Sequence, residues 1–386
     1  MIERKIKETK PVLAICYDFD KTLSPKDMQA QGYIQKVGYD VGKFWEESNA
    51  LAKDHGMDQN LAYMLKMLQS ARGKFVFNRK ALEEYGATVE LFPGVQDWFE
   101  RIRKYGEQKG VIVEHYIISS GLKEMIEGTS IAQQGAFEQI YASCFYYDED
   151  GVALWPAQVV NYTNKTQFLF RIEKGVLDVN DMGVNDPFPP EKIRVPFRNM
   201  VYIGDSDTDV PCMRLVNSYG GHSIGVYDSM TKSKSKVYKM MRERRIKYYA
   251  PADYSEGKEL DVLLKSIIDR TAANEELESK HYICKSETAD FDKRHPTGQR
   301  RKLVAIQELN DSYNFARTHI VIKKLGEFSE WSVEEMDELC RIAFANGQVR
   351  YVLSDSDVTN FYRKMLEKAE IVTPSIKQMK ERLHME

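Results

Sequence analysis

Two pairs of aspartates in the 386-residue chain have the types and spacing for metal and phosphate chemistry. Asp18 and Asp20 come directly after one apolar run, and Asp205 and Asp209 follow another in the middle of the chain. Carboxylates that end buried strands are costly to remove from water together, so they call for a compensating cation. Mg²⁺ fits such a set best, because it prefers octahedral oxygen coordination and is commonly held by one or two carboxylates plus a substrate phosphate. The aspartates therefore predict a shared site with Mg²⁺ as its cofactor.

Three short apolar runs must position these groups, and each has the pattern of a strand buried on both faces of a parallel sheet. They cover residues 11–17, 111–118 and 199–203, and each stops at polar residues, the second at Ser119. In doubly wound α/β sheets, ligands bind at the carboxyl ends of the strands. We therefore predict an α/β fold in which the three strand ends share one site.

An inserted helical subdomain is predicted between the first two runs, over about residues 33–85. Within it, Leu61, Met64, Leu65 and Leu68 follow the i, i+3, i+4, i+7 spacing of one helix face.

The second half of the chain is predicted to be rich in helices. The basic stretch 232–247 is more typical of a solvated helix face than of a surface that binds the phosphate backbone of a nucleic acid. The helix after this stretch is expected to end near Arg270. Residues 271–301 carry many charges and little apolar periodicity, so we expect a linker or an irregular segment there. From Lys302 onward the pattern is helical, with a capping box at residues 332–335.

The composition excludes several classes of protein. Lys and Arg total 55 against 58 Asp and Glu, so the net charge of −3 lacks the basic excess of a dedicated nucleic-acid binder. The five cysteines and seven histidines lack the spacing of a disulfide framework, a zinc ribbon or a histidine metal site. No apolar run reaches the roughly 18 residues that cross a bilayer, and the charged start of the chain is unlike a signal peptide. We therefore expect a soluble, cytoplasmic globular protein with no membrane partner.

In the order of its motifs the chain resembles the haloacid dehalogenase-like (HAD) hydrolase superfamily, and within it the phosphoserine-phosphatase-like branch. The first motif is an apolar strand followed by D-x-D-x-T-L, and in this chain that motif occupies residues 18–23. The second motif is an apolar strand that ends in serine or threonine, here Ser119. The Ser-Gly-Leu that follows it is similar to the Gly-Gly-Phe of that branch. The third motif is a lone lysine at the start of a helix, and Lys165 matches it, with Lys123 and Lys174 as alternative candidates. The fourth motif, G-D-x-x-x-D, is matched at residues 204–209.

The resemblance implies a Rossmann-like parallel sheet and a division of the chain. The catalytic core would comprise residues 1–23 and 93–270, and residues 24–92 would form a helical cap over the site. Residues 271–301 would be a linker, and a C-terminal helical domain at 302–386 lies outside the resemblance.

The resemblance also implies roles for individual residues. Asp18 would be the nucleophile that forms an aspartyl-phosphate, and Asp20 would protonate the leaving group and then activate water. Ser119 and Lys165 would stabilise the phosphoryl oxygens. The implied substrate-binding set is Ser119, Ser120, Gly121 and Lys165.

For the metal, the resemblance implies three ligands and one supporting residue. Mg²⁺ would be held by Asp18, by the backbone carbonyl of Asp20 and by Asp205, and Asp209 would orient the loop. The residues by themselves give only a carboxylate cluster suited to Mg²⁺ and phosphate.

The predicted function is a Mg²⁺-dependent phosphomonoesterase acting on a small phosphorylated metabolite, because a helical lid screens a site from bulky substrates. One alternative is phosphoryl transfer to an acceptor other than water. Another is a nucleic-acid-end or partner-directed phosphatase whose C-terminal helical region recruits a protein or an RNA. The identity of the substrate and the oligomeric state stay open, and the candidate lining residues of the cap are Tyr33, Phe44, Trp45 and Arg72.

Overall fold

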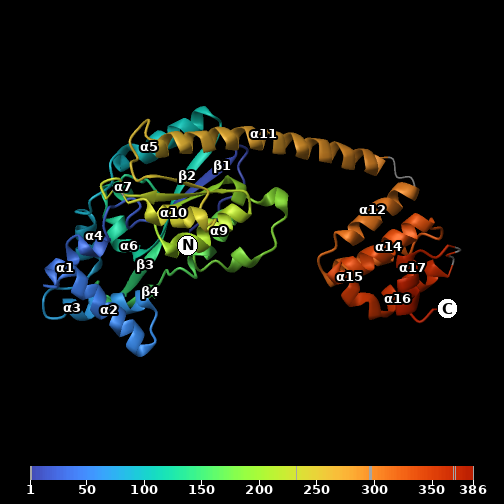
Figure 1. Cartoon of the computed structure of the whole chain (residues 1–386), viewed down its shortest axis with the longest axis horizontal. Helices are drawn as coiled ribbons and strands as arrows, with labels where there is room; N and C mark the ends of the chain where they lie inside the picture. The colour runs from blue at the N-terminus through green and yellow to red at the C-terminus, as the bar shows by residue number, and fades with distance from the viewer. Residues whose placement is uncertain (1, 232, 295–297, 368, 370, 386) are drawn as a thin grey trace. The chain divides into compact units, whose positions relative to one another are not determined.

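The structure, a computed structural model, describes residues 2–231, 233–294, 298–367, 369 and 371–385 (Figure 1). It divides into two compact units, Met1–Glu278 and Ser279–Glu386. Lys232 and residues 295–297, which belong to the predicted basic stretch and the predicted linker, lie outside the described residues.

The first unit is built on a seven-stranded sheet with the order β4-β3-β2-β1-β5-β6-β7. All neighbouring strands are parallel except β3 and β4, which pair antiparallel. The predicted α/β fold class with a Rossmann-like core is therefore confirmed. The strands are β1 (Val12–Tyr17), β2 (Ile112–Leu122), β3 (Gln139–Tyr147), β4 (Ala153–Gln158), β5 (Met200–Gly204), β6 (His222–Tyr227) and β7 (Tyr248–Pro251).

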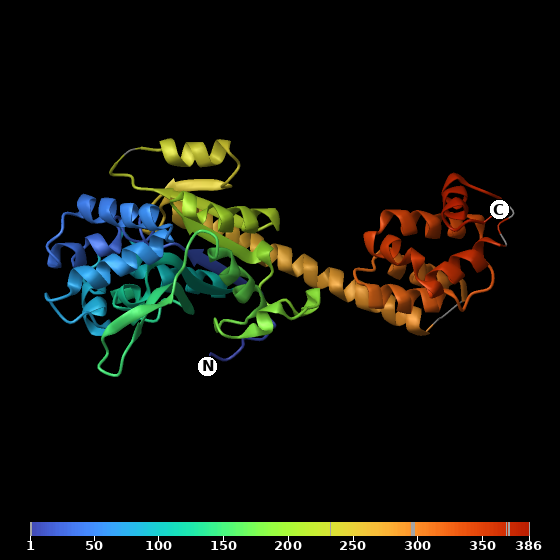
Figure 2. The ribbon, with the colours of Figure 1, turned by 90° about the horizontal axis from the view of Figure 1, so that it is seen from below.

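Helices cover both faces of this sheet (Figures 1 and 2). Alternate residues of the central strand β1 point to opposite faces, so Leu13 and Ile15 pack with α5 (Val95–Gln108) and α11 (Glu259–Arg294). Ala14 and Cys16 pack with the helices of the other face. Those helices are α8 (Lys165–Lys174), α9 (Val210–Ser218) and α10 (Ser235–Arg242).

Four helices lie between β1 and α5, and we call them the cap helices. The predicted insertion is helical, as expected from its spacing, and α4 packs closely on α6 (Lys123–Glu127) of the core. A Cβ atom on Gly86 would lie 2.0 Å from the Met125 carbonyl oxygen, and one on Gly128 would lie 2.0 Å from the Glu83 carbonyl oxygen. Only glycine fits at these two points of approach. The cap helices are α1 (Tyr33–Lys36), α2 (Val41–His55), α3 (Gln59–Ala71) and α4 (Arg79–Gly86), preceded by the 3₁₀ helix η1 (Met28–Ala30).

The remaining short elements of the first unit connect these layers. They are α7 (Ser130–Gln133), η2 (Met182–Asn185), η3 (Pro190–Lys192), η4 (Phe197–Asn199) and η5 (Asp207–Asp209).

The second unit is helical and has its own apolar core, which includes Leu309, Leu339 and Tyr362. The predicted capping box is present: the Ser332 N–H donates to Glu335 Oε2 at 2.9 Å, and the Glu335 N–H donates to Ser332 Oγ at 3.2 Å. The helices are α12 (Gly298–Asn310), α13 (Phe315–Leu325), α14 (Val333–Ala345), α15 (Gly347–Tyr351), η6 (Val352–Ser354), α16 (Ser356–Leu366) and α17 (Pro374–Arg382).

One sequence prediction about local structure is wrong. The helix expected to end near Arg270 continues to Arg294, so most of the segment predicted as irregular is helical. Its side chains from Ser279 to Ala289 are exposed, and a helix that is solvated all round needs no apolar face. Apolar periodicity therefore could not identify it.

Among the described residues, none of the helices combines the length and the apolar character that crossing a membrane requires.

Candidate active site

The carboxyl ends of β1 and β5 meet because the two strands are parallel neighbours, with Tyr17 paired to Ile203. The Asp18 N–H donates to the Ile203 carbonyl oxygen at 2.9 Å, which fixes the turn after β1 against the end of β5. Asp205 follows β5 directly. The predicted meeting of the two acidic strand ends therefore occurs.

Three buried carboxyl groups converge at this point. One carboxylate oxygen from each of Asp18, Asp205 and Asp209 lies within 4.8 Å of the others. The side chain of Asp20 is not part of this cluster, because its Oδ1 accepts a hydrogen bond from the Met28 N–H at 2.8 Å. The contribution predicted for Asp20 was its backbone carbonyl, and that role stays a prediction.

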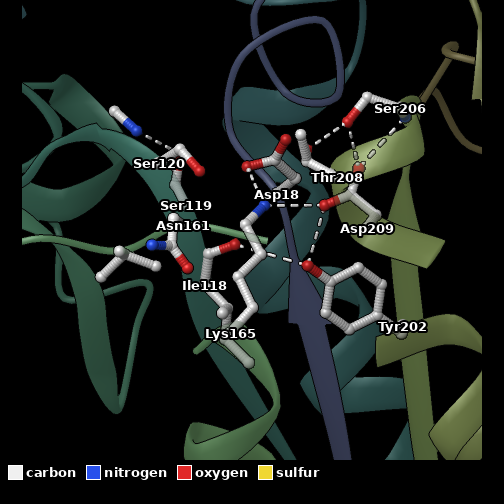
Figure 3. A network of polar contacts seen from close by, with 12 residues as sticks. Asp18, Ile118, Ser119, Ser120, Asn161, Lys165, Tyr202, Ser206, Thr208 and Asp209 are labelled. Carbon is white, nitrogen blue, oxygen red and sulfur yellow. Dashed lines mark hydrogen bonds and ion pairs between the residues drawn. The ribbon is translucent and has the colours of Figure 1, made fainter. Parts of the chain in front are cut away.

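Lys165 is the cation of the cluster, and it lies at the first position of α8 with no exposed surface. Its Nζ lies 3.2 Å from Asp18 Oδ1 and donates to Asp209 Oδ1 at 2.7 Å (Figure 3). The two competing lysines have other partners: Lys123 pairs with Glu127, and Lys174 donates to backbone carbonyls.

Asp209 has its oxygens occupied by the protein. Oδ1 also accepts from the Tyr202 hydroxyl at 3.0 Å, and Oδ2 accepts from the Ser206 N–H at 3.1 Å and from Ser206 Oγ at 2.9 Å (Figure 3). A Cβ atom on Gly204 would lie 2.5 Å from Asp209 Oδ2, so the fold of this loop requires glycine there. These contacts suit the predicted supporting role of Asp209.

The cluster has more negative than positive charge. Burial raises the pKa of Asp18 above its usual range, the Asp209 carboxylate raises it further, and Lys165 opposes both. Burial raises the pKa of Asp205 to about 6, although Lys236 opposes this with its Nζ 2.9 Å from Asp205 Oδ2. Buried like charges that lack a counter-charge are the arrangement that a divalent cation stabilises, and an all-oxygen donor set suits Mg²⁺. The residues present therefore fit the metal that the sequence predicts.

Asp20 lies beside this cluster in a different electrostatic state. Burial raises the pKa of Asp20 well above its usual range, and the carboxylates of Asp27 and Asp18 add to the rise. A carboxyl group that keeps its proton near neutral pH can act as a general acid.

The predicted phosphate-binding residues Ser119, Ser120 and Gly121 lie at the end of β2 and line the same cavity as Asp18 and Asp20. The cavity has a volume of about 560 Å³. Ser119 Oγ accepts from the Gly121 N–H at 3.1 Å. The structure thus brings all the site residues predicted from the sequence to one place, with Lys165 behind the cavity wall.

The cap helices close the cavity through three hydrogen bonds to the core. The Tyr63 hydroxyl donates to the Ser120 carbonyl oxygen at 2.7 Å, and Asn60 Nδ2 donates to the Val160 carbonyl oxygen at 2.8 Å. Asn161 Nδ2 donates to Asp58 Oδ2 at 2.8 Å. The start of α3 is therefore tied to both β2 and the segment before α8.

Only one of the four candidate lining residues of the cap lies at the cavity. Trp45 lines it, whereas Tyr33 and Phe44 are fully buried in the apolar core. Arg72 is exposed and is not part of the lining. The prediction is wrong for these three because helical spacing does not tell which turn of a helix ends above a cavity.

Several residues of the site were not found from the sequence. Tyr202 and Ser206 hold Asp209, and Tyr63 holds the Ser120 loop. Lys236 belongs to the basic stretch that was interpreted as a solvated face, yet it pairs with Asp205. Ser206 lies three residues before Asp209, which is the spacing of a capping box. Among these four residues, Ser206 is therefore the one whose role a local sequence pattern could have predicted.

This arrangement of a Rossmann-like sheet with aspartates after β1 and β5 is matched by a known family. The family described as haloacid dehalogenase-like hydrolase matches residues 15–214, more than half of the chain. The protein therefore belongs to the haloacid dehalogenase-like hydrolases.

Particular relatives are more distant. An uncharacterized protein of Borreliella burgdorferi is 28% identical over 281 residues, which are 66% of this chain and 96% of the relative. A HAD-family hydrolase from Salmonella enterica serovar Typhi is 16% identical, with a TM-score of 0.45 over 68% of this chain and 73% of that one. A probable phosphoserine phosphatase from Vibrio cholerae is 14% identical, with a TM-score of 0.45 over 69% of this chain and 67% of that one.

Proposed function

We propose that the protein is a Mg²⁺-dependent phosphomonoesterase that works through an aspartyl-phosphate on Asp18. The observation that carries this proposal is the convergence of the Asp18, Asp205 and Asp209 carboxyl groups, with Lys165 beside Asp18 and Asp209 and with Asp20 lining the same cavity as Asp18. A phosphate dianion and a divalent cation would complete the charges of such a cluster.

Mg²⁺ would be held by Asp18, by the backbone carbonyl of Asp20 and by Asp205. When bound, the ion supplies positive charge that offsets the repulsion between a carboxylate and a phosphate dianion.

In the first step, a carboxylate oxygen of Asp18 forms a bond to phosphorus while the bond from phosphorus to the leaving oxygen breaks. Lys165 orients the Asp18 carboxylate through its contact at 3.2 Å and keeps its own charge, because Asp18 and Asp209 raise the pKa of Lys165 although burial opposes this. Asp20 gives its proton to the leaving oxygen, which departs as an alcohol.

In the second step, water attacks the phosphorus of the aspartyl-phosphate and the bond to the Asp18 oxygen breaks. Asp20, now a carboxylate, takes a proton from the water, so the products are inorganic phosphate and the original enzyme. The Ser120 hydroxyl, which is buried without a partner, is available to donate to a phosphoryl oxygen. An alcohol could take the place of water, and phosphoryl transfer is the alternative that added acceptors would reveal.

The direct test is the release of phosphate from p-nitrophenyl phosphate with Mg²⁺ present. Asp18→Asn should abolish the reaction, and Asp150→Asn, at an exposed position in the β3–β4 turn, is the matched control. Equal turnover by the Asp18→Asn protein would refute the mechanism.

Two further proposals concern the rest of the molecule. The second unit is a compact helical unit with its own apolar core, which supports a separate role in recruiting a protein or an RNA. Co-purification with the full chain but not with a chain lacking residues 302–386 would test this. We also propose a cytoplasmic location, which cell fractionation would test.

A further inference from the structure

The part of the cavity beneath the cap carries buried polar atoms without a partner. Among the described residues, Gln29 Oε1 and Trp45 Nε1 make no hydrogen bond, and both residues line the cavity. The Gln29 side chain is only 2% exposed. A buried polar atom without a partner costs free energy, so these two atoms indicate a ligand that supplies the missing hydrogen bonds.

Gln29 lines the same cavity as Asp20 and is next in the chain to a residue that holds Asp20. It follows Met28, whose N–H holds the Asp20 carboxyl group at 2.8 Å. Because Asp20 is the proposed acid that protonates the leaving oxygen, we assign the Gln29 amide to the leaving group and not to the phosphate.

The cavity lining offers a leaving group no basic side chain that is unpaired. Its basic side chains already have carboxylate partners, with Lys21 Nζ 2.8 Å from Asp27 Oδ1 and Lys236 Nζ 2.9 Å from Asp205 Oδ2. The carboxylate of Asp58 accepts hydrogen bonds from neutral donors. Its Oδ1 accepts from the Asn60 N–H at 2.8 Å and its Oδ2 accepts from Asn161 at 2.8 Å.

A carboxylate on the leaving group would therefore be desolvated without a cation to compensate it, which is unfavourable. A phosphorylated amino acid, whose leaving group carries both an ammonium and a carboxylate, fits this lining poorly. An uncharged leaving group fits it well.

Aromatic and apolar side chains form one wall of this lining, beside polar residues such as Gln59 and Thr208. The Trp45 ring lies edge-on to Tyr63, with 5.7 Å between centroids, and Met57 and the exposed ring of Tyr162 complete the wall. Aromatic walls with a few polar atoms favour a ligand that has a planar ring. The cavity volume of about 560 Å³ leaves room for such a ring beside the phosphate.

We infer, resting on the proposed function, that the substrate is the phosphate ester of an uncharged, ring-bearing alcohol with hydrogen-bonding groups, as in a nucleoside monophosphate. Gln29 and Trp45 are its specificity-determining residues. The indole N–H donates to an acceptor of the leaving group, and the Gln29 amide oxygen accepts from a donor of the leaving group.

The first experiment compares kcat/KM for cytidine and adenosine monophosphates, ribose 5-phosphate and phosphoserine, with p-nitrophenyl phosphate as the general probe. The expected result is that at least one nucleoside monophosphate exceeds phosphoserine and ribose 5-phosphate by about 100-fold. Phosphoserine or ribose 5-phosphate as the best substrate would overturn the inference, while turnover of p-nitrophenyl phosphate would leave the proposed function standing.

The second experiment tests the two residues by binding, so that it does not depend on turnover. In the Asp18→Asn background, Trp45→Phe keeps the ring and removes the N–H, and Gln29→Leu removes the amide. Each should weaken binding of the preferred nucleoside monophosphate, measured by calorimetry, by about fivefold to tenfold. The matched control is Trp155→Phe, because Trp155 is 68% exposed on β4 and lies outside the cavity lining.

The outcomes separate the two proposals. Nucleoside monophosphate binding that is absent, or unchanged in both Trp45→Phe and Gln29→Leu, would overturn the inference. If no phosphate ester is hydrolysed but nucleoside monophosphates bind and both variants weaken that binding, the proposed function fails and the ligand assignment holds.

Discussion

Two buried ionic clusters lie on the same sheet, and they differ in charge balance. The site cluster, made of Asp18, Asp205, Asp209 and Lys165, gathers three carboxyl groups around one lysine at the carboxyl ends of β1 and β5. The second, which we call the structural cluster, is centred on Glu114 near the start of β2.

In the structural cluster every charge of the central pair is matched. Arg194 binds Glu114 with two hydrogen bonds of 2.7 and 2.8 Å, and Lys5 Nζ adds a third at 2.6 Å. The Tyr116 hydroxyl donates to Glu114 Oε2 at 2.6 Å. Burial alone would raise the pKa of Glu114, but the guanidinium of Arg194 outweighs it and lowers this pKa to about 2.

The comparison distinguishes structural from functional burial of charge. Burial raises the pKa in both clusters, but the cations around Glu114 outweigh it and lower the pKa of Glu114, whereas Lys165 and Lys236 do not outweigh it for Asp18 and Asp205. A cluster that is completed by its own chain stabilises the fold. One that is left unbalanced is a candidate for completion by a ligand, and we propose that a cation and a phosphate complete this one.

The largest effect is expected for Asp18→Asn. The substitution keeps the shape of the side chain and removes the nucleophile, so activity should fall by more than about a thousandfold. Because it also removes one of three crowded carboxyl groups, the melting temperature without Mg²⁺ should not fall. Steady-state kinetics and thermal unfolding check the two parts, and a destabilised protein would show that Asp18 is structural.

Lys165→Met should destabilise the folded protein, whereas Asp18→Asn should not. The lysine substitution leaves Asp18 and Asp209 buried without their cation, and the loss of one partner of a buried ion pair costs about 3–5 kcal/mol. Urea unfolding measures the loss. The variant Lys174→Met, on the same helix, is the control, and equal stability of the two proteins would contradict the role of Lys165 as the central cation.

Glu114→Gln should separate stability from activity. The depressed pKa means that the ionised form of Glu114 contributes stability fully above pH 4.5, and that this contribution is lost as the pH falls from about 4.5 towards 2. The difference between the two values corresponds to about 3 kcal/mol, which the variant should lose at pH 7.

The same variant should keep its activity within about twofold, because Glu114 lies five residues, about 16 Å, along β2 from Ser119. Urea unfolding between pH 7 and pH 3 and kinetics at pH 7 check both statements. Stability of Glu114→Gln equal to that of the unaltered protein at pH 7 would show that the structural cluster contributes nothing.

The site cluster could be predicted from the sequence and the structural cluster could not. Asp18 and Asp205 directly follow apolar strands, so their meeting follows from local pattern and from the geometry of a parallel sheet. Glu114 and Arg194 are 80 residues apart and neither stands in a motif, so only the folded chain brings them together. Separation along the chain also hides the contact of Tyr63 with Ser120, 57 residues apart, and of Lys236 with Asp205, 31 residues apart.

The three strands predicted from the sequence are β1, β2 and β5, whereas β3, β4, β6 and β7 were missed, although β6 is also a buried inner strand. β1 and β5 are apolar runs buried on both faces. β4 is an edge strand that contains Pro156 and exposes Leu154 and Trp155, so no alternation marks it. The helix beyond Arg270 was missed for the related reason that it has no buried face to create a period.

Mg²⁺ binding measured by calorimetry tests most directly whether the unbalanced cluster is a cation site. The unaltered protein and Glu114→Gln should bind the ion with equal affinity, and Asp205→Asn should bind it at least about tenfold more weakly, because it loses one charged ligand. Absence of binding to the unaltered protein, or equal binding by Asp205→Asn, would contradict the assignment of this cluster as the metal site.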